Sequence, residues 1–222
     1  MRGKDFKVHW HSPFDPLMAT SPINNPGDYN EANGWQYFWT SSQYDTNGMM
    51  KLLGGKRNFT NQLDSFFIIK TPNPDKLLGQ EAMIHGNEPS HHLTYLFSYS
   101  DQPKKGQEYI HKIVKDFYDN TPTGMIGNDD CGQMSAWYIL STLGIYQVNP
   151  ASNEFVFGAP QVKKAVINLK GGKDFIIKTK NYSDSNIYSF KRYLNNKKLS
   201  NPFITYDEIM KGDNLKFIMQ CN

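Results

Sequence analysis

The chain has 222 residues, of which 38% are hydrophobic, 14% aromatic and 20% charged. This composition supports a buried core and argues against intrinsic disorder. No apolar run approaches the roughly 18 residues that a membrane span needs, so we expect a soluble protein. Met1 to Asp5 have no apolar stretch behind them, so the chain as numbered shows no signal peptide. Cys131 and Cys221 match no zinc, haem or disulfide-framework spacing.

Charge is unevenly distributed along the chain. Residues 1–150 carry 12 Lys+Arg and 15 Asp+Glu, whereas residues 151–222 carry 12 and 6. The lysines of the second region alternate with β-branched and aromatic residues, as they do on the solvent face of a sheet. We therefore expect two regions with different roles and no nucleic-acid partner.

The first fifty residues are predicted to be irregular, because prolines at 13, 16, 22 and 26 interrupt any helix. Apolar residues then recur with a helical period in four stretches, at 59–67, 93–99, 109–117 and 131–143. Ser90 is the predicted N-cap of the second helix, and Gly144 is predicted to end the fourth.

After Pro150 the apolar period changes to two, which predicts strands. They are expected over 173–179, 186–194 and 214–220, with Asn195-Asn196 as a hairpin turn. The predicted fold class is α+β, with four to seven helices in a helical portion over residues 1–147 and a mostly antiparallel sheet in a β region over 148–222.

Three segments concentrate polar groups beyond what folding requires. The first, at residues 28–39, sets Glu31 close to Trp35, Tyr37 and Trp39. Flat aromatic rings suit the C–H face of a sugar, and apolar surroundings raise the pKa of a carboxyl group towards that of a proton donor. The alternative is an aromatic helix that packs inward, with Glu31 at its exposed start.

The second segment runs from His85 to His92. Its three histidines, His85, His91 and His92, suit zinc by type, but their spacing does not put two of them on one helical face, and no Cys joins them. Asn87 and Glu88 instead offer oxygen ligands, which suit calcium. The alternative is an Asn-Glu-Pro helix start in which the histidines are satisfied polar groups. Both interpretations fit this segment.

The third segment, at residues 124–138, contains the adjacent carboxylates Asp129 and Asp130, with Asn128 before them and Gln133 after them. Two carboxylates side by side repel each other unless a cation or a shared proton lies between them. An N-cap followed by an acid in the first helical turn is the structural alternative. The composition of the segment favours a functional site.

Together the three segments resemble glycoside hydrolase family 92. The likeness rests on Tyr-Asn-Glu-Ala-Asn-Gly-Trp-Gln-Tyr around Glu31, Gly-Asn-Glu-Pro-Ser-His-His at 86–92 and Gly-Asn-Asp-Asp-Cys-Gly-Gln-Met-Ser-Ala-Trp-Tyr at 127–138. It extends in order from about residue 20 to residue 160. The sequence departs from the family at Ala32, where glycine is usual, and at 41–45, where Ser-Ser-Gln-Tyr-Asp replaces a more common Pro-His-Asp.

The resemblance implies a calcium-dependent, exo-acting α-mannosidase. Family members place a β-sandwich before an (α/α)6 helical barrel, so the chain is expected to form the C-terminal part of the helical barrel and the β region that follows. The implied partners are a mannose-containing glycan and the missing N-terminal β-sandwich part of the enzyme. Without that part we expect weak activity or none. We expect the full-length protein to be secreted, periplasmic or at the cell surface.

The implied reaction is inverting hydrolysis of terminal mannose, of α-1,2 type. By motif match Glu31 is the general acid and Asp130 the general base, with Asp129 or Asn128 helping to hold the water. The other implied site residues are the calcium ligands Glu88 and Asn87 and the substrate-binding residues Trp35, Gln36, Asn128, His91 and His92.

Two other classes of function remain open from the sequence. A non-catalytic carbohydrate-binding or structural fragment is one, because half a barrel exposes apolar helix faces. A zinc-dependent hydrolase that uses His85, His91 and His92 is the other. Bound calcium, bound zinc or no bound metal distinguishes the three classes.

Overall fold

The computed structural model describes residues 9, 12, 15–17, 32–70 and 81–221. Its helical elements are α1 (Gly34–Thr40), η2 (Ser41–Gln43), α2 (Thr46–Leu52), α3 (Lys56–Ile68), η3 (Ala82–Gly86), η4 (Glu88–Ser90), α4 (Leu93–Leu96), η5 (Phe97–Tyr99), α5 (Pro103–Phe117), η6 (Asp130–Gly132), α6 (Gln133–Leu143) and α7 (Tyr206–Met210). Its strands are β1 (Ile145–Tyr146), β2 (Glu154–Phe157), β3 (Lys164–Leu169), β4 (Lys173–Lys180), β5 (Tyr188–Leu194), β6 (Lys197–Lys198), β7 (Phe203–Thr205) and β8 (Asn214–Gln220). Within this part of the chain, no helix combines the length and the apolar character that crossing a bilayer requires.

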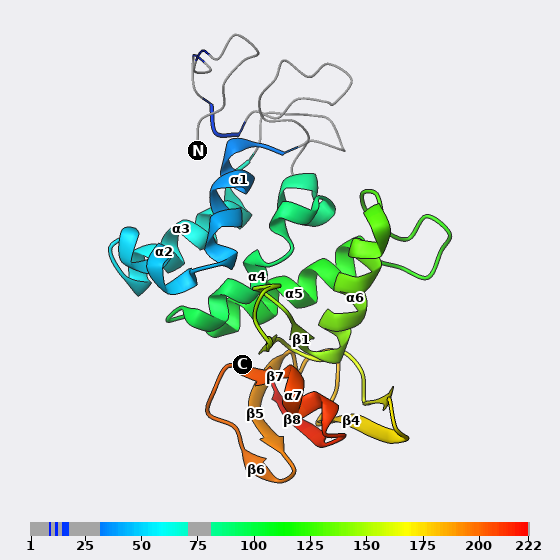
Figure 1. The fold of residues 1–222 in the computed structure, drawn as a ribbon. Helices are drawn as coiled ribbons and strands as arrows, with labels where there is room; N and C mark the ends of the chain where they lie inside the picture. Colours follow the sequence, from blue (N-terminus) through cyan, green and yellow to red (C-terminus); the bar gives the residue numbers. More distant parts are fainter. Residues whose placement is uncertain (1–8, 10–11, 13–14, 18–31, 71–80, 222) are drawn as a thin grey trace. The chain divides into compact units, whose positions relative to one another are not determined.

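Helices α1 to α6 come before the strands, and only the short α7 lies among them, between β7 and β8, which confirms the predicted α+β class (Figure 1). The chain forms two compact units that are not divided at this change of element type. The first unit is Met1–Leu93 with Asp119–Met134, and the second is Thr94–Tyr118 with Ser135–Asn222. The second unit therefore contains α5 and most of α6 as well as all the strands.

The strands of the second unit form two sheets. The larger has the order β3-β4-β8-β5-β6, and the smaller has the order β1-β2-β7. All neighbours are antiparallel except β4 and β8, which run parallel because β8 returns to lie between β4 and β5. The mostly antiparallel sheet agrees with the sequence prediction, whereas β1, β2, β3, β7 and α7 had not been predicted.

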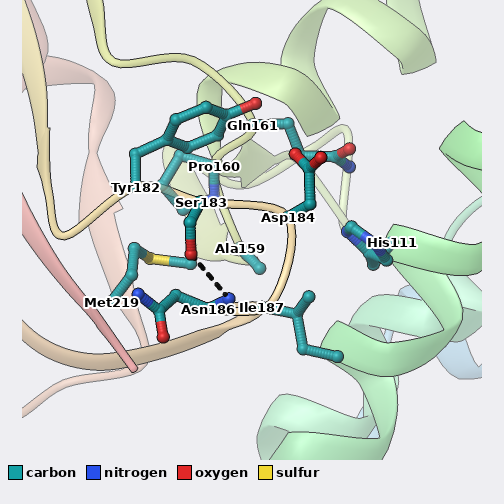
Figure 2. A pocket seen from close by; sticks show the side chains of 10 residues that line it. All are labelled: His111, Ala159, Pro160, Gln161, Tyr182, Ser183, Asp184, Asn186, Ile187 and Met219. Atoms are coloured by element: carbon teal, nitrogen blue, oxygen red, sulfur yellow. Dashed lines mark hydrogen bonds between the residues drawn. The ribbon is translucent and has the colours of Figure 1, made fainter. Parts of the chain in front are cut away.

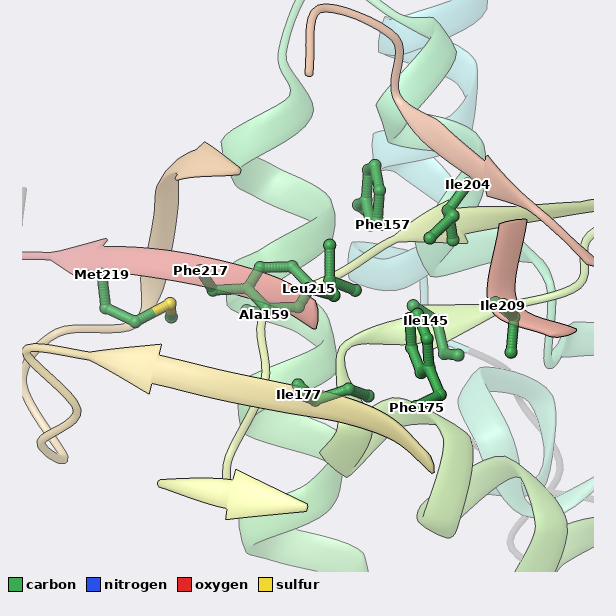
Figure 3. Packing of buried hydrophobic residues seen from close by; sticks show 10 residues of the cluster. All are labelled: Ile145, Phe157, Ala159, Phe175, Ile177, Ile204, Ile209, Leu215, Phe217 and Met219. Carbon is green, nitrogen blue, oxygen red and sulfur yellow. The ribbon is translucent and has the colours of Figure 1, made fainter. Parts of the chain in front are cut away.

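The core of the second unit lies on one face of the larger sheet. Phe175 and Ile177 of β4 and Leu215 and Phe217 of β8 are completely buried, and Figure 3 shows their side chains within one cluster. Their neighbours in sequence alternate to the opposite face. This alternation is the period of two that predicted the strands.

Positive backbone φ angles occur at two predicted chain reversals. Asn195 and Asn196, with φ of 47° and 68°, make the turn between β5 and β6, and asparagine tolerates this left-handed region better than most residues. Gly144 ends α6 at a φ of 82°, where a Cβ would also press against Pro160.

Helices of the first unit pack through aromatic residues. The predicted stripe of α3, Phe59 to Phe67, is buried, and the Trp39 ring of α1 meets the Phe59 ring edge to face with 5.6 Å between centroids. The prediction of an irregular first fifty residues is wrong from residue 34 onward, because α1 and α2 begin there behind the side-chain caps Asn33 and Asp45. The proline-rich stretch before them lies mostly outside the described residues.

Ser90 is not the helix cap that the sequence predicted. Its hydroxyl donates to the carbonyl of Met83 at 2.5 Å. Ser90 ends η4, and the chain beyond it forms α4 and η5 instead of one helix. A hydrogen bond to a carbonyl seven residues earlier takes the place of the predicted cap.

Three buried histidines join the elements of the first unit. Burial lowers the pKa of His91 and of His92 to about 4, although each ring also bonds a backbone carbonyl that raises it. Burial, and then the charge of His91, lowers the pKa of His85 well below 6.5. All three rings are therefore neutral at pH 7.

We expect the chain to lose stability as the pH falls from 6.5 towards 4. The unfolded histidines take up protons below about pH 6.5, and the folded ones do so only near pH 4. The lowered pKa values of His91 and His92 therefore each reduce the free energy of unfolding by about 3 kcal/mol as the pH falls from 6.5 to below 4. Denaturant unfolding measured between pH 7 and 5, where most carboxylates stay ionised, tests this. His91→Gln should reduce the slope of the unfolding free energy against pH by close to one proton. Equal slopes in the wild type and the variant would contradict the interpretation.

Candidate functional site

The first predicted motif is described only from Ala32 onward. Glu31, the predicted acid, lies outside the described residues. Directly after it, Asn33 and Gln36 form a reciprocal capping box at the start of α1, in which each side chain accepts a hydrogen bond from the other residue's backbone N–H. Trp35 follows in the first turn and stacks on Phe38 with 5.5 Å between ring centroids. The aromatic helix of the structural alternative is therefore present.

Gln36 joins the first motif to the second. Its Nε2 donates to the hydroxyl of Ser90 at 3.0 Å, and this hydroxyl in turn donates to Met83. Gln36 is 3% exposed and Ser90 is 1% exposed. This buried chain of hydrogen bonds fixes α1 against η3 and η4.

A close backbone approach joins the second motif to the third. Gly127 has a φ of 71°, and a Cβ added to it would collide with the carbonyl oxygen of Gly86. In return, a Cβ on Gly86 would lie 3.3 Å from the side chain of Ile126. Only glycine permits this contact. Because Asn87-Glu88 and Asn128-Asp129 follow directly on the two glycines, the oxygen-rich segments start from one point.

The third motif has a backbone unlike an ordinary helix start. Asp129 occupies the N-cap position of η6, but its side chain makes no capping hydrogen bond. Cys131 has a φ of 60° and Gly132 a φ of 83°. A left-handed non-glycine residue costs about 1–2 kcal/mol, and such strain is concentrated at functional sites. Asp130, between the N-cap and the strained residue, is exposed to solvent.

The adjacent histidines His91 and His92 point to different neighbours. His91 lies 3.1 Å from the carbonyl of His85 and 3.0 Å from the sulfur of Met134 through Nε2, and Gln133 Nε2 lies 3.4 Å from its Nδ1. Because an amide nitrogen only donates, Nδ1 accepts and Nε2 carries the proton. His91 thus connects the second motif to the end of the third.

His92 contacts η2 and the end of α1 instead of the third motif. Its Nδ1 accepts from Gln43 at 3.1 Å, and its Nε2 lies 3.0 Å from the carbonyl of Trp39 and 3.2 Å from the hydroxyl of Ser42. The ring is 0% exposed. Ser42 and Gln43 therefore both contact this histidine, while Asp45, which follows shortly after them, caps α2.

The donor groups of this unit suit calcium better than zinc. The rings of His85 and His91 stack with 4.7 Å between centroids and do not converge on a point, and within the described ranges no three His, Cys, Asp or Glu side chains form a group able to hold a metal. Calcium also accepts amide and backbone oxygens and water, so Asn87 and Glu88 fit as part of a ligand set. The half-buried Glu88 stands in the first turn of η4, directly after a π-helical turn of a kind often found at functional sites.

A small cavity of about 50 Å³ in the second unit contains none of the predicted site residues. His111 of α5 faces the loop at 182–187 across it (Figure 2). Gln161 Nε2 also lines this region and is buried without a hydrogen-bond partner among the described residues. The volume admits only a few water molecules and is far below the roughly 300 Å³ of the smallest typical ligand pockets.

Sequence reasoning missed the residues that hold the motifs together. Gly86, Gly127, Ser90 and Gln43 all make contacts between segments far apart in the chain. The only signal in the sequence was glycine directly beside the polar motifs, which does not say what the glycine contacts.

Known proteins resemble this chain along nearly its whole length. The family model described as "Glycosyl hydrolase family 92 catalytic domain" matches residues 1–221. A family GH92 α-mannosidase from Bacteroides thetaiotaomicron is 38% identical, with a TM-score of 0.84 over 100% of this chain and 28% of the solved one. A structure of that α-mannosidase in complex with mannoimidazole is 36% identical, with a TM-score of 0.86 over 100% of this chain and 30% of the solved one.

Two further relatives extend the comparison. A family GH92 inverting mannosidase from the same organism is 28% identical, with a TM-score of 0.80 over 97% of this chain and 30% of that structure. An uncharacterized secreted glycosidase of Arthroderma benhamiae is 26% identical over 220 residues, which cover 92% of this chain and 26% of the relative. The chain thus spans less than a third of the length of these relatives. Because the family model matches almost every residue, the chain belongs to glycosyl hydrolase family 92.

Proposed function

We propose that the chain carries the catalytic carboxylates of an inverting, exo-acting α-mannosidase of α-1,2 type, which removes terminal mannose from glycans. The observation that carries the proposal is the contact of Gly86 with Gly127, from which two oxygen-rich segments start. Membership of the family supports the reaction class, and the likeness to the inverting mannosidase from Bacteroides thetaiotaomicron supports its stereochemistry. We also propose that helices α1 to α6 belong to an (α/α)6 barrel.

In this proposal Glu31 protonates the glycosidic oxygen and Asp130 takes a proton from the attacking water. Inverting enzymes hold the two carboxyl groups roughly 6.5–9.5 Å apart, so that a water fits between base and sugar. The exposure of Asp130 and the strained residue behind it suit a base that must reach water. Asp129 and Asn128 are the proposed partners of that water.

The remaining predicted residues divide by burial. Asn128 is exposed and Trp35 half-buried, which suits direct contact with a sugar. Gln36, His91 and His92 are almost completely buried and bonded to neighbouring elements, so we assign them to positioning the motifs.

Glu88 and Asn87 are the proposed residues of this chain that hold calcium. When bound, the ion would ligate sugar hydroxyls and favour the distorted ring of an oxocarbenium-like transition state. Around the ion, the chain's own residues would supply carboxylate and amide oxygens, and the contact of Gly86 with Gly127 brings together the two backbones on which they and the acidic pair follow. A secreted, periplasmic or cell-surface location is proposed as well, and the relative named as a secreted glycosidase supports it.

Substitution of the two carboxylates should separate their roles in the full-length protein. Glu31→Gln should lower the rate on α-mannosides with poor leaving groups by about 10²–10⁴-fold and have a milder effect on activated aryl mannosides, which need little protonation. Asp130→Asn should be severe on both, because the water must be deprotonated whatever leaves. Rates on the two substrate types measure this.

Asp45→Asn is the matched control, since asparagine caps a helix as well as aspartate does and Asp45 belongs to the same unit. It should leave both rates unchanged. If a good leaving group restored the rate of Asp130→Asn but not that of Glu31→Gln, the assignments of acid and base would have to be exchanged. If mannoimidazole binds but no variant changes turnover, the carbohydrate-binding alternative would replace the catalytic one.

Gly127→Ala should separate the second and third motifs, and Gly132→Ala is its control. Both positions have positive φ, but only at Gly127 would the new methyl group collide with backbone, since no atom lies within 4 Å at Gly132. We expect about 1 kcal/mol of lost stability for Gly132→Ala and about 3 kcal/mol for Gly127→Ala. Affinity for mannoimidazole, measured well below each melting temperature, should fall mainly in Gly127→Ala.

The milder Gly86→Ala variant keeps the test decisive if Gly127→Ala does not fold. Its methyl group would lie in tight contact with Ile126 rather than overlapping a backbone atom. An intermediate loss of affinity is expected. Wild-type affinity in both variants would show that the contact does not organise the site.

Calcium should stabilise the chain through Glu88. Binding at concentrations far above the dissociation constant contributes about 3 kcal/mol, which corresponds to a rise in melting temperature of about 5–10 °C that a chelator reverses. Glu88→Gln should lose most of this rise, whereas Glu81→Gln, an exposed glutamate of the same unit, should retain it. Stabilisation by zinc instead of calcium would contradict the assignment.

A further inference from the structure

The outer face of the larger sheet carries a row of aligned lysines. Lys164 of β3 lies opposite Lys178 of β4, and Lys178 lies opposite Lys216 of β8. The row continues through Tyr193 of β5 to Lys198 of β6. Residues directly opposite each other across paired strands point to the same face, so these side chains share one surface. This is the face that the buried core does not use.

Almost no negative charge balances this row. Lys180 and Lys191 flank it on the same face, each opposite Ile218 of β8. The only carboxylate on this face of the five strands is Asp174, and it accepts a hydrogen bond from Asn168. Like charges opposite each other destabilise a sheet, and solvent faces ordinarily interleave both signs. A row that folding alone would not favour points to a ligand.

A hollow lies where this row meets the hairpin of β5 and β6. It has a volume of about 400 Å³ and is lined by Lys178, Asn195, Asn196, Asn214, Leu215 and Lys216. Asn195 Oδ1 accepts from the backbone N–H of Asn214 at 3.0 Å, which fixes the hairpin against β8. Lys216 Nζ lies 5.0 Å from the centroid of the Tyr193 ring, which holds the amine beside the hollow.

The groups around the hollow offer two kinds of recognition. Two lysine amines attract an anionic group as point charges, and three asparagine side chains both donate and accept hydrogen bonds. Sugar hydroxyls need both donors and acceptors. Successive unpaired nucleotides instead need a series of aromatic rings to stack on. The outer face of these strands has two aromatic residues, Tyr193 in the row and Phe190 at the bulge of β5, which do not form such a series. The groups around the hollow therefore favour a glycan over a single-stranded nucleic acid.

We propose that this face binds an acidic glycan, with one sulfate, phosphate or carboxylate group of the polymer between Lys178 and Lys216 and the neighbouring hydroxyls on the asparagines. The surface belongs to the second unit and contains none of the proposed catalytic or calcium-binding residues. It therefore goes beyond the proposed hydrolysis, and its test does not require turnover.

The test compares two double variants that lose the same charge. Lys178→Gln/Lys216→Gln removes the amines of the hollow, and Lys170→Gln/Lys211→Gln removes two exposed lysines outside these strands in the same unit. Binding of the chain to dextran sulfate, polygalacturonate, a phosphorylated mannan and neutral dextran is measured by calorimetry at about 0.15 M salt, where distant charges are screened. Circular dichroism and melting temperature show that each variant is folded.

Wild-type chain should bind at least one of the three acidic polymers and not neutral dextran, and the strongest of the three identifies the anionic group. Affinity for that polymer should fall about tenfold or more in the hollow variant and less than about twofold in the control. Equal losses in both variants would mean nonspecific charge attraction and would overturn the site. Tighter binding of single-stranded or duplex DNA than of every glycan in the same buffer would overturn the choice of partner.

Discussion

Two backbones that touch at Gly86 and Gly127 organise the first unit. A Cβ on Gly127 would collide with the carbonyl oxygen of Gly86, and a Cβ on Gly86 would be in tight contact with Ile126, so the approach depends on glycine at 127 above all and on its positive φ. The polar residues that follow each glycine start from this contact. Residues about forty positions apart in the chain thereby start from one point of the first unit.

Buried neutral histidines link the elements around this contact through hydrogen bonds. His91 reaches towards the end of the third motif, while His92 holds η2 and the end of α1. Both depend on amide donors, Gln133 and Gln43, to fix the position of the ring proton. Desolvation lowers the pKa of each ring, so each ring stays uncharged and can both donate and accept a hydrogen bond between neighbouring elements. Folding and site geometry therefore share the same polar network, and acid weakens both.

The second unit separates its two surfaces by strand alternation. One face of the larger sheet packs Phe175, Ile177 and Phe217 into the core, and the other presents lysines in register. Parallel pairing of β4 with β8 brings Lys178 and Lys216 together, although the two lysines are far apart in sequence. The excess of positive charge after residue 150 is therefore concentrated on one face, where it can recognise a ligand.

Sequence by itself determined the α+β class, the buried stripe of α3, the Asn195-Asn196 turn and the family of the chain, because each depends on local period, turn chemistry or a contiguous motif. It missed α1 and α2, which follow the proline-rich start, and it predicted Ser90 as a helix cap. Only the tertiary structure decided that Ser90 bonds Gln36 and Met83, that Gly127 meets Gly86, and that α5 belongs with the sheets. These are contacts between distant segments, whose partners no local pattern specifies, and they decide which polar residues lie together.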